Sequence, residues 1–299
     1  MKVSFVTCDV FTNRPFTGNP LLVVPDATGL GAEEMQAIAR EINYSESTFV
    51  LPAQDPRHAY LQRTFVPVRE IPYAGHPTVG TAMVMSWLGR LGSARDLTIE
   101  VGFGPLRLKL DGANGAATRV TMEQGTPSWG DEIEDVELLG KLASATSAPF
   151  DDLLGPLKPR VVSTGNRFLI VPLGGVASLA ATALDPRILA LVEEALDVVG
   201  VYLFAFAANG RIRARSFCPG AGVPEDPATG SAAGPLGVYL AVNHAFPGGV
   251  PHFTIDQGLE MGRPSEIEVE VLLGGSPSRP TGVLVSGSAV KMMEGTLDL

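Results

Sequence analysis

The chain has 299 residues, of which 45% are hydrophobic and 18% are charged, and its formal net charge is −10. This length and apolar content favour two domains with buried cores and argue against a disordered chain. The acidic balance, without basic runs, argues against nucleic acid and anionic membranes as partners. The sequence begins with a strand pattern rather than a signal peptide and contains no apolar run of membrane-spanning length, so we expect a cytoplasmic protein.

The first 123 residues predict mostly strands, together with two helices. Met35, Ile38 and Ile42 recur at helical spacing and predict a helix over 31–42. A second helix is expected from 76 to about 91, and its lack of a polar face is typical of a helix buried inside a lobe. The predicted strands are 2–10, 21–25, 47–51, 60–66, 97–101, 105–110 and 118–123, with a hairpin turn at Asn114-Gly115.

Residues 125–131, rich in Gly, Pro and Ser, are the best candidate for a linker. Beyond them the order of elements repeats, again with an apolar helix that follows an Arg-Ser-Phe strand. The predicted helices are 132–145, 186–199 and 229–243. The predicted strands are 160–163, 167–173, 200–207, 211–217, 252–256, 266–273, 281–286 and 289–295, with a turn at Asn209-Gly210.

Internal repeats support a duplicated domain. Three pairs of segments match at offsets of 147 (164 − 17), 152 (215 − 63) and 150 (230 − 80). The pairs are Thr17-Gly18-Asn19 with Thr164-Gly165-Asn166, Arg63-Thr64-Phe65 with Arg215-Ser216-Phe217, and Gly80-Thr81-Ala82 with Gly230-Ser231-Ala232. Small drifts in the offset are what insertions leave after a duplication. We therefore expect two similar lobes with a site between them, since ligand sites favour domain interfaces.

The expected fold class is α+β, with two pseudo-symmetric lobes that are each a mostly antiparallel sheet around a central helix. The N-terminal lobe is expected over 1–125, completed by a C-terminal strand at about 285–299. The C-terminal lobe is expected over 126–284.

Polar residues that differ between the two copies are the candidates for chemistry. Gly75-His76 precedes the first apolar helix, and the run from Glu225 to Ser231 precedes the second. Helix starts present free N–H groups and a positive dipole end, so two of them facing one cleft would hold a substrate carboxylate. Gly75 and Gly230 would allow close approach of the backbone.

Glu46 lies in the segment Asn43-Tyr44-Ser45-Glu46-Ser47, which has no counterpart in the second copy. Partial desolvation beside the apolar residues at 48–50 would raise its pKa toward a value useful in acid/base catalysis. Simpler structural roles stay open at this stage for each candidate. Glu46 could be a solvated side chain, His76 and Asp226 could be helix caps, and Ser231 could serve close packing.

Several other chemistries lack a motif in this sequence. Its two cysteines, Cys8 and Cys218, and its four histidines show no metal-ligand spacing. Dinucleotide-binding, phosphate-loop and serine-hydrolase patterns are also missing. These patterns therefore give no indication of a metal centre or of a dinucleotide cofactor.

Five motifs together resemble the PhzF-like (phenazine biosynthesis) isomerase family and extend from about residue 9 to residue 265. They are Asp9-Val10-Phe11-Thr12 with Phe16-Thr17-Gly18-Asn19-Pro20, Asn43 to Phe49, Gly75 to Ala82, Glu225 to Ala232, and Gln257-Gly258 with Met261 to Ser265. The resemblance implies a diaminopimelate-epimerase-like fold and a cofactor-independent isomerase that acts as a homodimer on a small carboxylate-bearing molecule, either an amino acid or a cyclohexadiene-like compound. It also implies roles for individual residues. The catalytic residues would be Glu46, His76 and Asp226, and the substrate-binding residues would be Ser45, Gly75, Gly230 and Ser231.

The resemblance also marks a departure from related racemases, which carry a cysteine at the start of each central helix. This chain has His76 at the first helix and Ala228 to Ser231 at the second. A single base that removes and returns a proton is therefore favoured over a two-thiol racemase. Two alternatives stay open, namely an epimerase of an amino or hydroxy acid on the same fold and a non-catalytic binding or scaffold protein.

Overall fold

The structure, a computed structural model, describes residues 1–113, 116–208, 210–275 and 279–299. Two units are distinguished by their internal contacts: residues 1–123 with 286–299 form the first unit, and residues 124–285 form the second. The turn predicted at Asn114-Gly115 and the Asn209 half of the second predicted turn lie outside the described residues. In the part of the chain that is described, no helix is long and apolar enough to cross a membrane.

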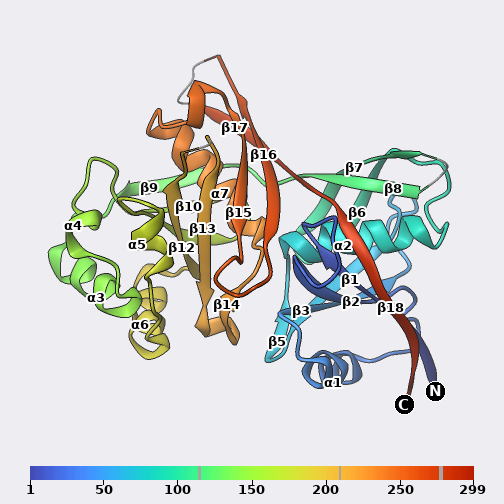
Figure 1. Cartoon of the computed structure of the whole chain (residues 1–299). Helices are drawn as coiled ribbons and strands as arrows, with labels where there is room; N and C mark the ends of the chain where they lie inside the picture. Colours follow the sequence, from blue (N-terminus) through green and yellow to red (C-terminus); the bar gives the residue numbers. More distant parts are fainter. Residues whose placement is uncertain (114–115, 209, 276–278) are drawn as a thin grey trace. The chain divides into compact units, whose positions relative to one another are not determined.

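The first unit surrounds helix α2 (Gly75–Trp87) with strands (Figure 1). Almost every residue of α2 is buried, because the helix contacts strands of its own unit on several sides. Helix α1 (Ala32–Ile42) covers an outer core that includes Leu22, Phe49 and Phe65. The strands are β1 (Lys2–Val10), β2 (Asn19–Val24), β3 (Glu46–Leu51), β4 (Leu61–Val66), β5 (Arg69–Ile71), β6 (Asp96–Val101), β7 (Gly104–Ala113), β8 (Ala116–Glu123) and β18 (Ala289–Asp298).

The second unit repeats this plan around helix α7 (Gly230–Val242). Its outer core lies under α3 (Val136–Thr146), α5 (Val176–Ala180) and α6 (Pro186–Leu196). A short helix, α4 (Phe150–Leu153), packs beside α3. The strands are β9 (Ser128–Glu132), β10 (Arg160–Ser163), β11 (Arg167–Pro172), β12 (Gly200–Phe206), β13 (Ile212–Cys218), β14 (Val223–Asp226), β15 (His252–Gln257), β16 (Ser265–Leu273) and β17 (Pro280–Gly287), the last of which crosses the boundary between the units at 285/286. Two 3₁₀ turns cover Pro219–Ala221 and Pro247–Gly249.

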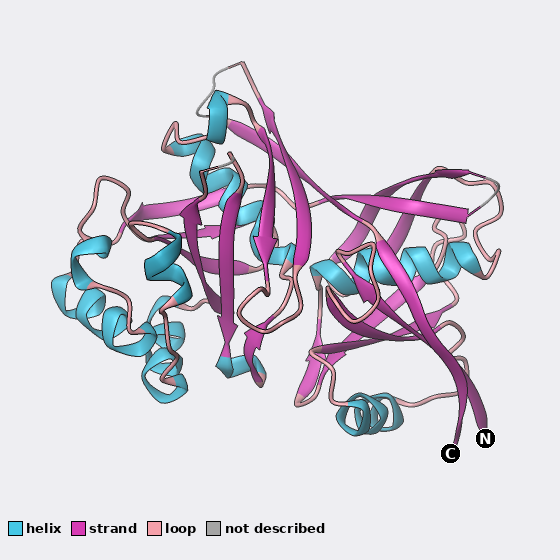
Figure 2. Cartoon of the chain, in the orientation of Figure 1, coloured by secondary structure: helices cyan, strands magenta, loops and turns pink. Residues whose placement is uncertain are grey.

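Strand pairing follows the same pattern in both units. In the first unit β2–β3 and β4–β6 are parallel, while β1–β2, β3–β4, β4–β5 and β6–β7 are antiparallel. In the second unit β11–β12 and β13–β15 are parallel, while β10–β11, β12–β13, β13–β14 and β15–β16 are antiparallel. The α+β prediction of two similar, mostly antiparallel arrangements around a central helix is therefore confirmed (Figure 2).

Two sequence-based predictions are wrong in detail. The segment predicted as a linker, 125–131, contains most of β9, which pairs with β10 as part of the second unit. The match between Gly80 and Gly230 is also displaced. Both central helices have 13 residues, and they begin at Gly75 and Gly230, so the structural offset is 155 (230 − 75). Gly75 and His76 consequently belong to the first turn of α2 rather than preceding it.

Candidate active site

Glu46 begins strand β3 beside Leu21 of β2, at the end of the loop that follows α1. Its side chain is only 15% exposed, and carboxylate oxygen Oε2 lies 3.4 Å from His76 Nδ1. This burial agrees with the partial desolvation expected from the sequence. The carboxylate therefore lies next to an imidazole and is largely shielded from solvent.

His76 is the second residue of α2 and is 2% exposed. Burial lowers the pKa of its imidazole to about 3, so the ring is neutral near pH 7. Its 3.4 Å approach to Glu46 is consequently not an ion pair. The sequence placed these two residues about 30 positions apart, and the fold brings them together.

Asn19 fixes the orientation of the His76 ring. The Ser45 hydroxyl donates to Asn19 Oδ1 at 2.8 Å, which leaves Asn19 Nδ2 facing His76 Nδ1 at 3.0 Å. An amide nitrogen can only donate, so Nδ1 accepts and the ring proton is assigned to Nε2. Nε2 is buried and has no hydrogen-bond partner among the described residues. The fold thus presents a neutral N–H donor without using it internally.

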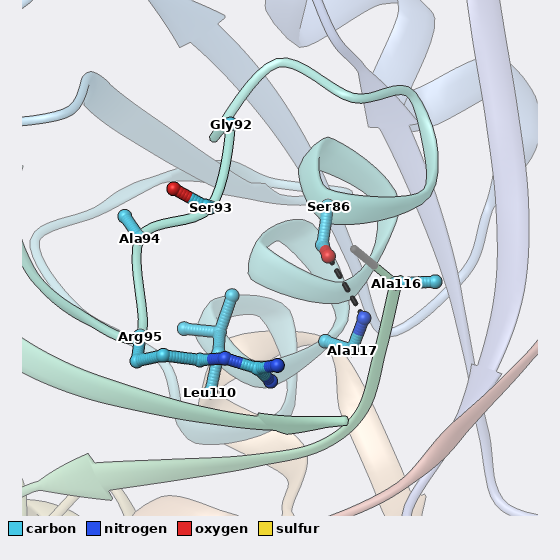
Figure 3. A pocket seen from close by; sticks show the side chains of 8 residues that line it. All are labelled: Ser86, Gly92, Ser93, Ala94, Arg95, Leu110, Ala116 and Ala117. Atoms are coloured by element: carbon cyan, nitrogen blue, oxygen red, sulfur yellow. Dashed lines mark hydrogen bonds between the residues drawn. The ribbon is translucent and has the colours of Figure 1, made fainter. Parts of the chain in front are cut away.

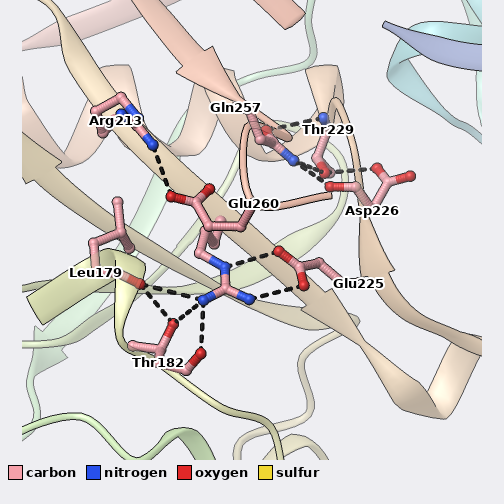
Figure 4. Close-up of polar contacts among 9 residues, drawn as sticks. Leu179, Thr182, Arg213, Glu225, Asp226, Thr229, Gln257 and Glu260 are labelled. Atoms are coloured by element: carbon pink, nitrogen blue, oxygen red, sulfur yellow. Dashed lines mark hydrogen bonds and ion pairs between the residues drawn. The ribbon is translucent and has the colours of Figure 1, made fainter. Parts of the chain in front are cut away.

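Asp226 ends strand β14, and its side chain is buried. Thr229 donates its hydroxyl to Asp226 Oδ2 at 2.6 Å, and Gln257 donates to the backbone oxygen of Asp226 at 2.7 Å (Figure 4). The preceding residue, Glu225, forms a two-bonded ion pair with Arg215, at 2.8 and 2.9 Å. These contacts fix the chain on both sides of the carboxylate.

The N-termini of α2 and α7 carry no side-chain caps. Their N-cap residues are Ala74 and Thr229, and neither first turn contains an acid. Gly75 and Gly230 occupy the first helical position, and His76 and Ser231 occupy the second. In the second unit Gln124 Nε2 donates to the Gly230 carbonyl at 2.8 Å and so stabilises this first turn. Uncapped helix starts with a glycine are suited to bind an anion.

Neither cysteine lies at a central helix. Cys8 is on β1 and Cys218 ends β13, and both are buried thiols outside any disulfide. Burial raises the pKa of the Cys8 thiol far above its usual range, so it is no nucleophile at neutral pH. Neither central helix therefore presents a thiol at its start.

A hollow in the first unit lies apart from the predicted site residues of that unit (Figure 3). It lies where the segment from Gly92 to Arg95 passes the C-terminal part of α2 and the strand residues Leu110, Ala116 and Ala117. Two of its polar side chains are engaged within the protein, since Ser86 accepts from Ala117 N and Arg95 donates to the Gly112 carbonyl. We assign it a structural role.

Three polar residues of these networks were not singled out from the sequence: Asn19, Thr229 and Gln257. Asn19 had a signal, because it ends one of the repeated segments. Gln257 also lay within a motif of the resemblance, but its role depends on a contact with a residue 31 positions earlier. Such a contact cannot be read from local pattern.

Comparisons with known proteins agree on one family. A family model described as "Phenazine biosynthesis-like protein" matches residues 8–295. A trans-2,3-dihydro-3-hydroxyanthranilate isomerase from Pseudomonas chlororaphis is 38% identical over 295 residues, which cover 99% of each chain. A Bacillus anthracis phenazine biosynthesis protein of the PhzF family has a TM-score of 0.86 at 28% identity, with 100% of each chain covered. A probable proline racemase from Agrobacterium radiobacter is similar in fold, with a TM-score of 0.68 at 14% identity, covering 99% of this chain and 93% of that one.

Proposed function

We propose an activity for this chain from one established premise, namely that it belongs to the phenazine biosynthesis-like (PhzF) protein family. The activity is isomerisation of a small carboxylate-bearing molecule by transfer of one proton, with Glu46 as the only base. The observation that carries the proposal is the mostly buried Glu46 carboxylate beside a neutral imidazole. A base in this setting is poorly hydrated, and the ring beside it carries its donor, Nε2–H, on the atom that does not face Glu46.

The proton balance needs only this one carboxylate. Ionised Glu46 removes a proton from an activated C–H bond, and the electron pair moves into the conjugated system of the substrate. Protonated Glu46 then returns a proton, either the original one or one exchanged with solvent, to another carbon, which restores the carboxylate and shifts the double bond. No net proton, electron or second reactant is consumed, so the residues of this chain suffice for the reaction.

His76 has a distinct role in this proposal. Its Nε2–H, which has no partner among the described residues, donates to a polar group of the substrate. A neutral donor stabilises charge that develops during proton removal without competing for the proton itself. Ser45 supports this arrangement through Asn19, and the lone pairs of its hydroxyl stay available to accept from substrate.

The remaining predicted residues bind and orient the substrate. Gly75 and Gly230 expose helix N–H groups to its carboxylate, and Ser231 adds a hydroxyl. Asp226 accepts from a polar N–H or O–H of the substrate, and we assign it to the catalytic set with Glu46 and His76. Formation of a homodimer and a location in the cytoplasm stay predictions from the sequence.

The relative from Pseudomonas chlororaphis acts, by its name, on trans-2,3-dihydro-3-hydroxyanthranilate. We propose that this chain takes the same substrate class, a ring with a conjugated diene, an amino group and a carboxylate. Such a molecule supplies an activated C–H bond and an anion for the helix starts.

The test is to incubate the enzyme with trans-2,3-dihydro-3-hydroxyanthranilate in D₂O and to follow the reaction by ¹H NMR. Migration of the double bond, at a rate proportional to enzyme concentration, is the expected result. Deuterium uptake with inversion at one carbon would instead indicate an epimerase. Binding without any exchange, here and across a panel of cyclic and acyclic amino acids, would contradict the proposal and favour a binding protein.

A further inference from the structure

Gln257 is a buried amide at the end of β15 whose hydrogen-bonding capacity is fully used. Its Oε1 accepts from the Tyr202 hydroxyl at 2.8 Å and from Thr229 N at 3.1 Å. Its Nε2 donates to the Asp226 carbonyl at 2.7 Å and to Thr229 Oγ1 at 2.9 Å. One side chain therefore binds both ends of the segment that leads into α7 (Figure 4).

The direction of each hydrogen bond in this network follows from Thr229 N, because a backbone N–H can only donate and therefore makes the contacted amide atom of Gln257 its oxygen. Burial, and then the negative charge of Asp226, raise the pKa of the Tyr202 hydroxyl well above its ordinary value, so this group keeps its proton. It donates to the same Gln257 oxygen, and Nε2 is turned toward Thr229 Oγ1. Because Thr229 Oγ1 accepts from Nε2, its own proton is directed to Asp226 Oδ2.

The first unit provides an internal comparison, because its strands pair in the same way. Thr64 pairs with Ile71 where Ser216 pairs with Asp226, so Ile71 is the counterpart of Asp226. Ala74 is the counterpart of Thr229, since each is the N-cap of its central helix.

The counterpart of Gln257 follows from its neighbouring glycine. A Cβ on Gly258 would lie 2.5 Å from the Pro227 carbonyl oxygen, and a Cβ on Gly102 would lie 2.6 Å from Pro72 Cα. Both glycines thus pack against the proline that follows the Asp226 or Ile71 position. Gln257 consequently corresponds to Val101, the residue before Gly102.

The comparison separates scaffold from function. The first unit builds the same strand pairs and a helix of the same length with Ile71, Ala74 and Val101 at these positions. The polar network of Asp226, Thr229 and Gln257 is therefore not needed to form this architecture. Buried polar groups are costly unless they are satisfied, so their presence in one copy alone indicates a use in that copy.

We propose that Gln257 is a positioning residue that fixes the Asp226 carboxylate through Thr229 for its contact with substrate. The part of this inference that concerns substrate rests on the proposed function. The part that concerns the carboxylate rests on the hydrogen bonds of the second unit alone.

The central variant is Gln257→Val, which introduces the residue that the first unit carries at this position. We expect a folded protein whose kcat/KM on trans-2,3-dihydro-3-hydroxyanthranilate is roughly 100-fold lower, because small misplacements of a catalytic group have effects of this size. Gln257→Glu has nearly the same shape as glutamine, but an ionised carboxylate cannot donate to Thr229. This variant should therefore be impaired like Gln257→Val. The matched control is Gln36→Val, which removes an amide that donates to the Val66 and Pro67 carbonyls in the first unit and should leave kcat/KM unchanged.

A double-mutant cycle distinguishes positioning from a general structural effect. If Gln257 acts through Asp226, Gln257→Val should change kcat/KM by less than about twofold in an Asp226→Asn background, because groups that act as a unit are non-additive. Equal losses in both backgrounds would overturn the proposal.

A crystal structure of the Gln257→Val protein provides a readout that needs no substrate. The expected result is loss of the 2.6 Å contact between Thr229 Oγ1 and Asp226 Oδ2, with Asp226 displaced or in several conformers. An unchanged Asp226 would overturn the inference. If the unmodified enzyme fails to convert the test compound, the proposed substrate class is contradicted, and this crystal structure decides the inference.

Discussion

The two Arg-Thr/Ser-Phe strands form the same local structure in different surroundings. Arg63 binds both carboxylate oxygens of Glu70, at 2.7 and 2.6 Å, and lies 5.2 Å from the ring centroid of Phe65. Arg215 does the same with Glu225, and lies 5.1 Å from the ring centroid of Phe217. The repeated sequence therefore specifies one ion pair and one stacking contact, twice.

The surroundings differ in burial and in additional hydrogen bonds. The Arg63 side chain is 25% exposed, whereas that of Arg215 is 8% exposed. Arg215 also donates to the hydroxyl and the carbonyl of Thr182. Its partner, Glu225, precedes Asp226, while the partner of Arg63 precedes Ile71. The more elaborate copy is thus the one that leads to a candidate catalytic carboxylate.

The helix starts differ in the complementary way. His76 in the first unit corresponds to Ser231 in the second, since each is the second residue of its central helix. The first unit thus contributes an imidazole next to Glu46, and the second contributes a carboxylate with a polar support. The two units thus share a frame, and the candidate chemistry lies at a few positions where they differ.

The largest expected effect comes from removing the carboxylate that the second unit carries where the first unit has Ile71. Asp226→Asn should lower kcat/KM roughly 1,000-fold while the protein stays folded, because loss of a preorganised, charged hydrogen-bond partner of the substrate has effects up to about this order. Steady-state kinetics with thermal unfolding check the result. Asp185→Asn is the control, since asparagine also caps a helix and Asp185 is the N-cap of α6. Full activity of Asp226→Asn would contradict the catalytic assignment.

Substitution of the two arginines tests whether the same ion pair contributes differently to the free energy of unfolding in each unit. Arg215→Met should lower the free energy of unfolding by about 3 kcal/mol. The reason is that the poorly solvated Glu225 carboxylate and the Thr182 oxygens lose their donor. Arg63→Met, at a more exposed pair, should lower it by at most about 1 kcal/mol. Urea unfolding of both variants measures the difference, and equal losses would show that burial does not distinguish the two copies.

His76 predicts sensitivity to acid. Its folded pKa of about 3 lies below that of an unfolded histidine, so its neutral form stabilises the fold above pH 6.5, and this stability is lost as the pH falls. The free energy of unfolding should decrease by about 1.4 kcal/mol for each pH unit below 6.5 from this group. Urea unfolding at several pH values gives the free energy of unfolding as a function of pH. Its decrease toward acid should be less steep in His76→Asn than in the exposed-site control His252→Asn. Identical slopes would contradict a buried neutral ring.

Glu193, in the second unit, predicts the opposite pH dependence of the free energy of unfolding, and a smaller effect. Burial raises the pKa of this α6 carboxyl to about 7, although Gly220 N donates to it at 3.0 Å. Its folded pKa exceeds its unfolded pKa, so its contribution is fully present below pH 4.5 and is lost as the pH rises to about 7. Glu193→Gln should therefore gain about 1 kcal/mol of stability at pH 8. The exposed neighbour Glu194→Gln should gain nothing, and a loss in Glu193→Gln would contradict the assignment.

Sequence reasoning predicted the fold well because the duplicated pattern is local. The buried helices α2 and α7 follow from their lack of a polar face, and the family follows from motifs in order along the chain. The predicted linker was wrong because the Gly- and Pro-containing run at 125–131 pairs with β10, a partner about 30 residues away. Composition alone does not report such pairing.

The sequence allowed the candidate site residues to be predicted, but not the hydrogen bonds that link them to residues distant in sequence. The expected desolvation of Glu46 depended on its apolar neighbours, which are adjacent in sequence. The Asn19–His76 contact and the Gln257 network depend on strand register, which single-residue patterns do not determine. The displaced Gly80–Gly230 match shows the same limit, since small-residue patterns recur along a helix and only the helix start fixes the alignment.

The central claim is that one carboxylate moves the proton, and Glu46→Gln tests it most directly. The variant and the control Glu41→Gln, an exposed carboxylate at the end of α1, are incubated with trans-2,3-dihydro-3-hydroxyanthranilate in D₂O and compared by NMR. Loss of double-bond migration and of deuterium incorporation in Glu46→Gln alone, with the fold retained, is the predicted result. Deuterium incorporation at the unmodified rate in Glu46→Gln would contradict the account.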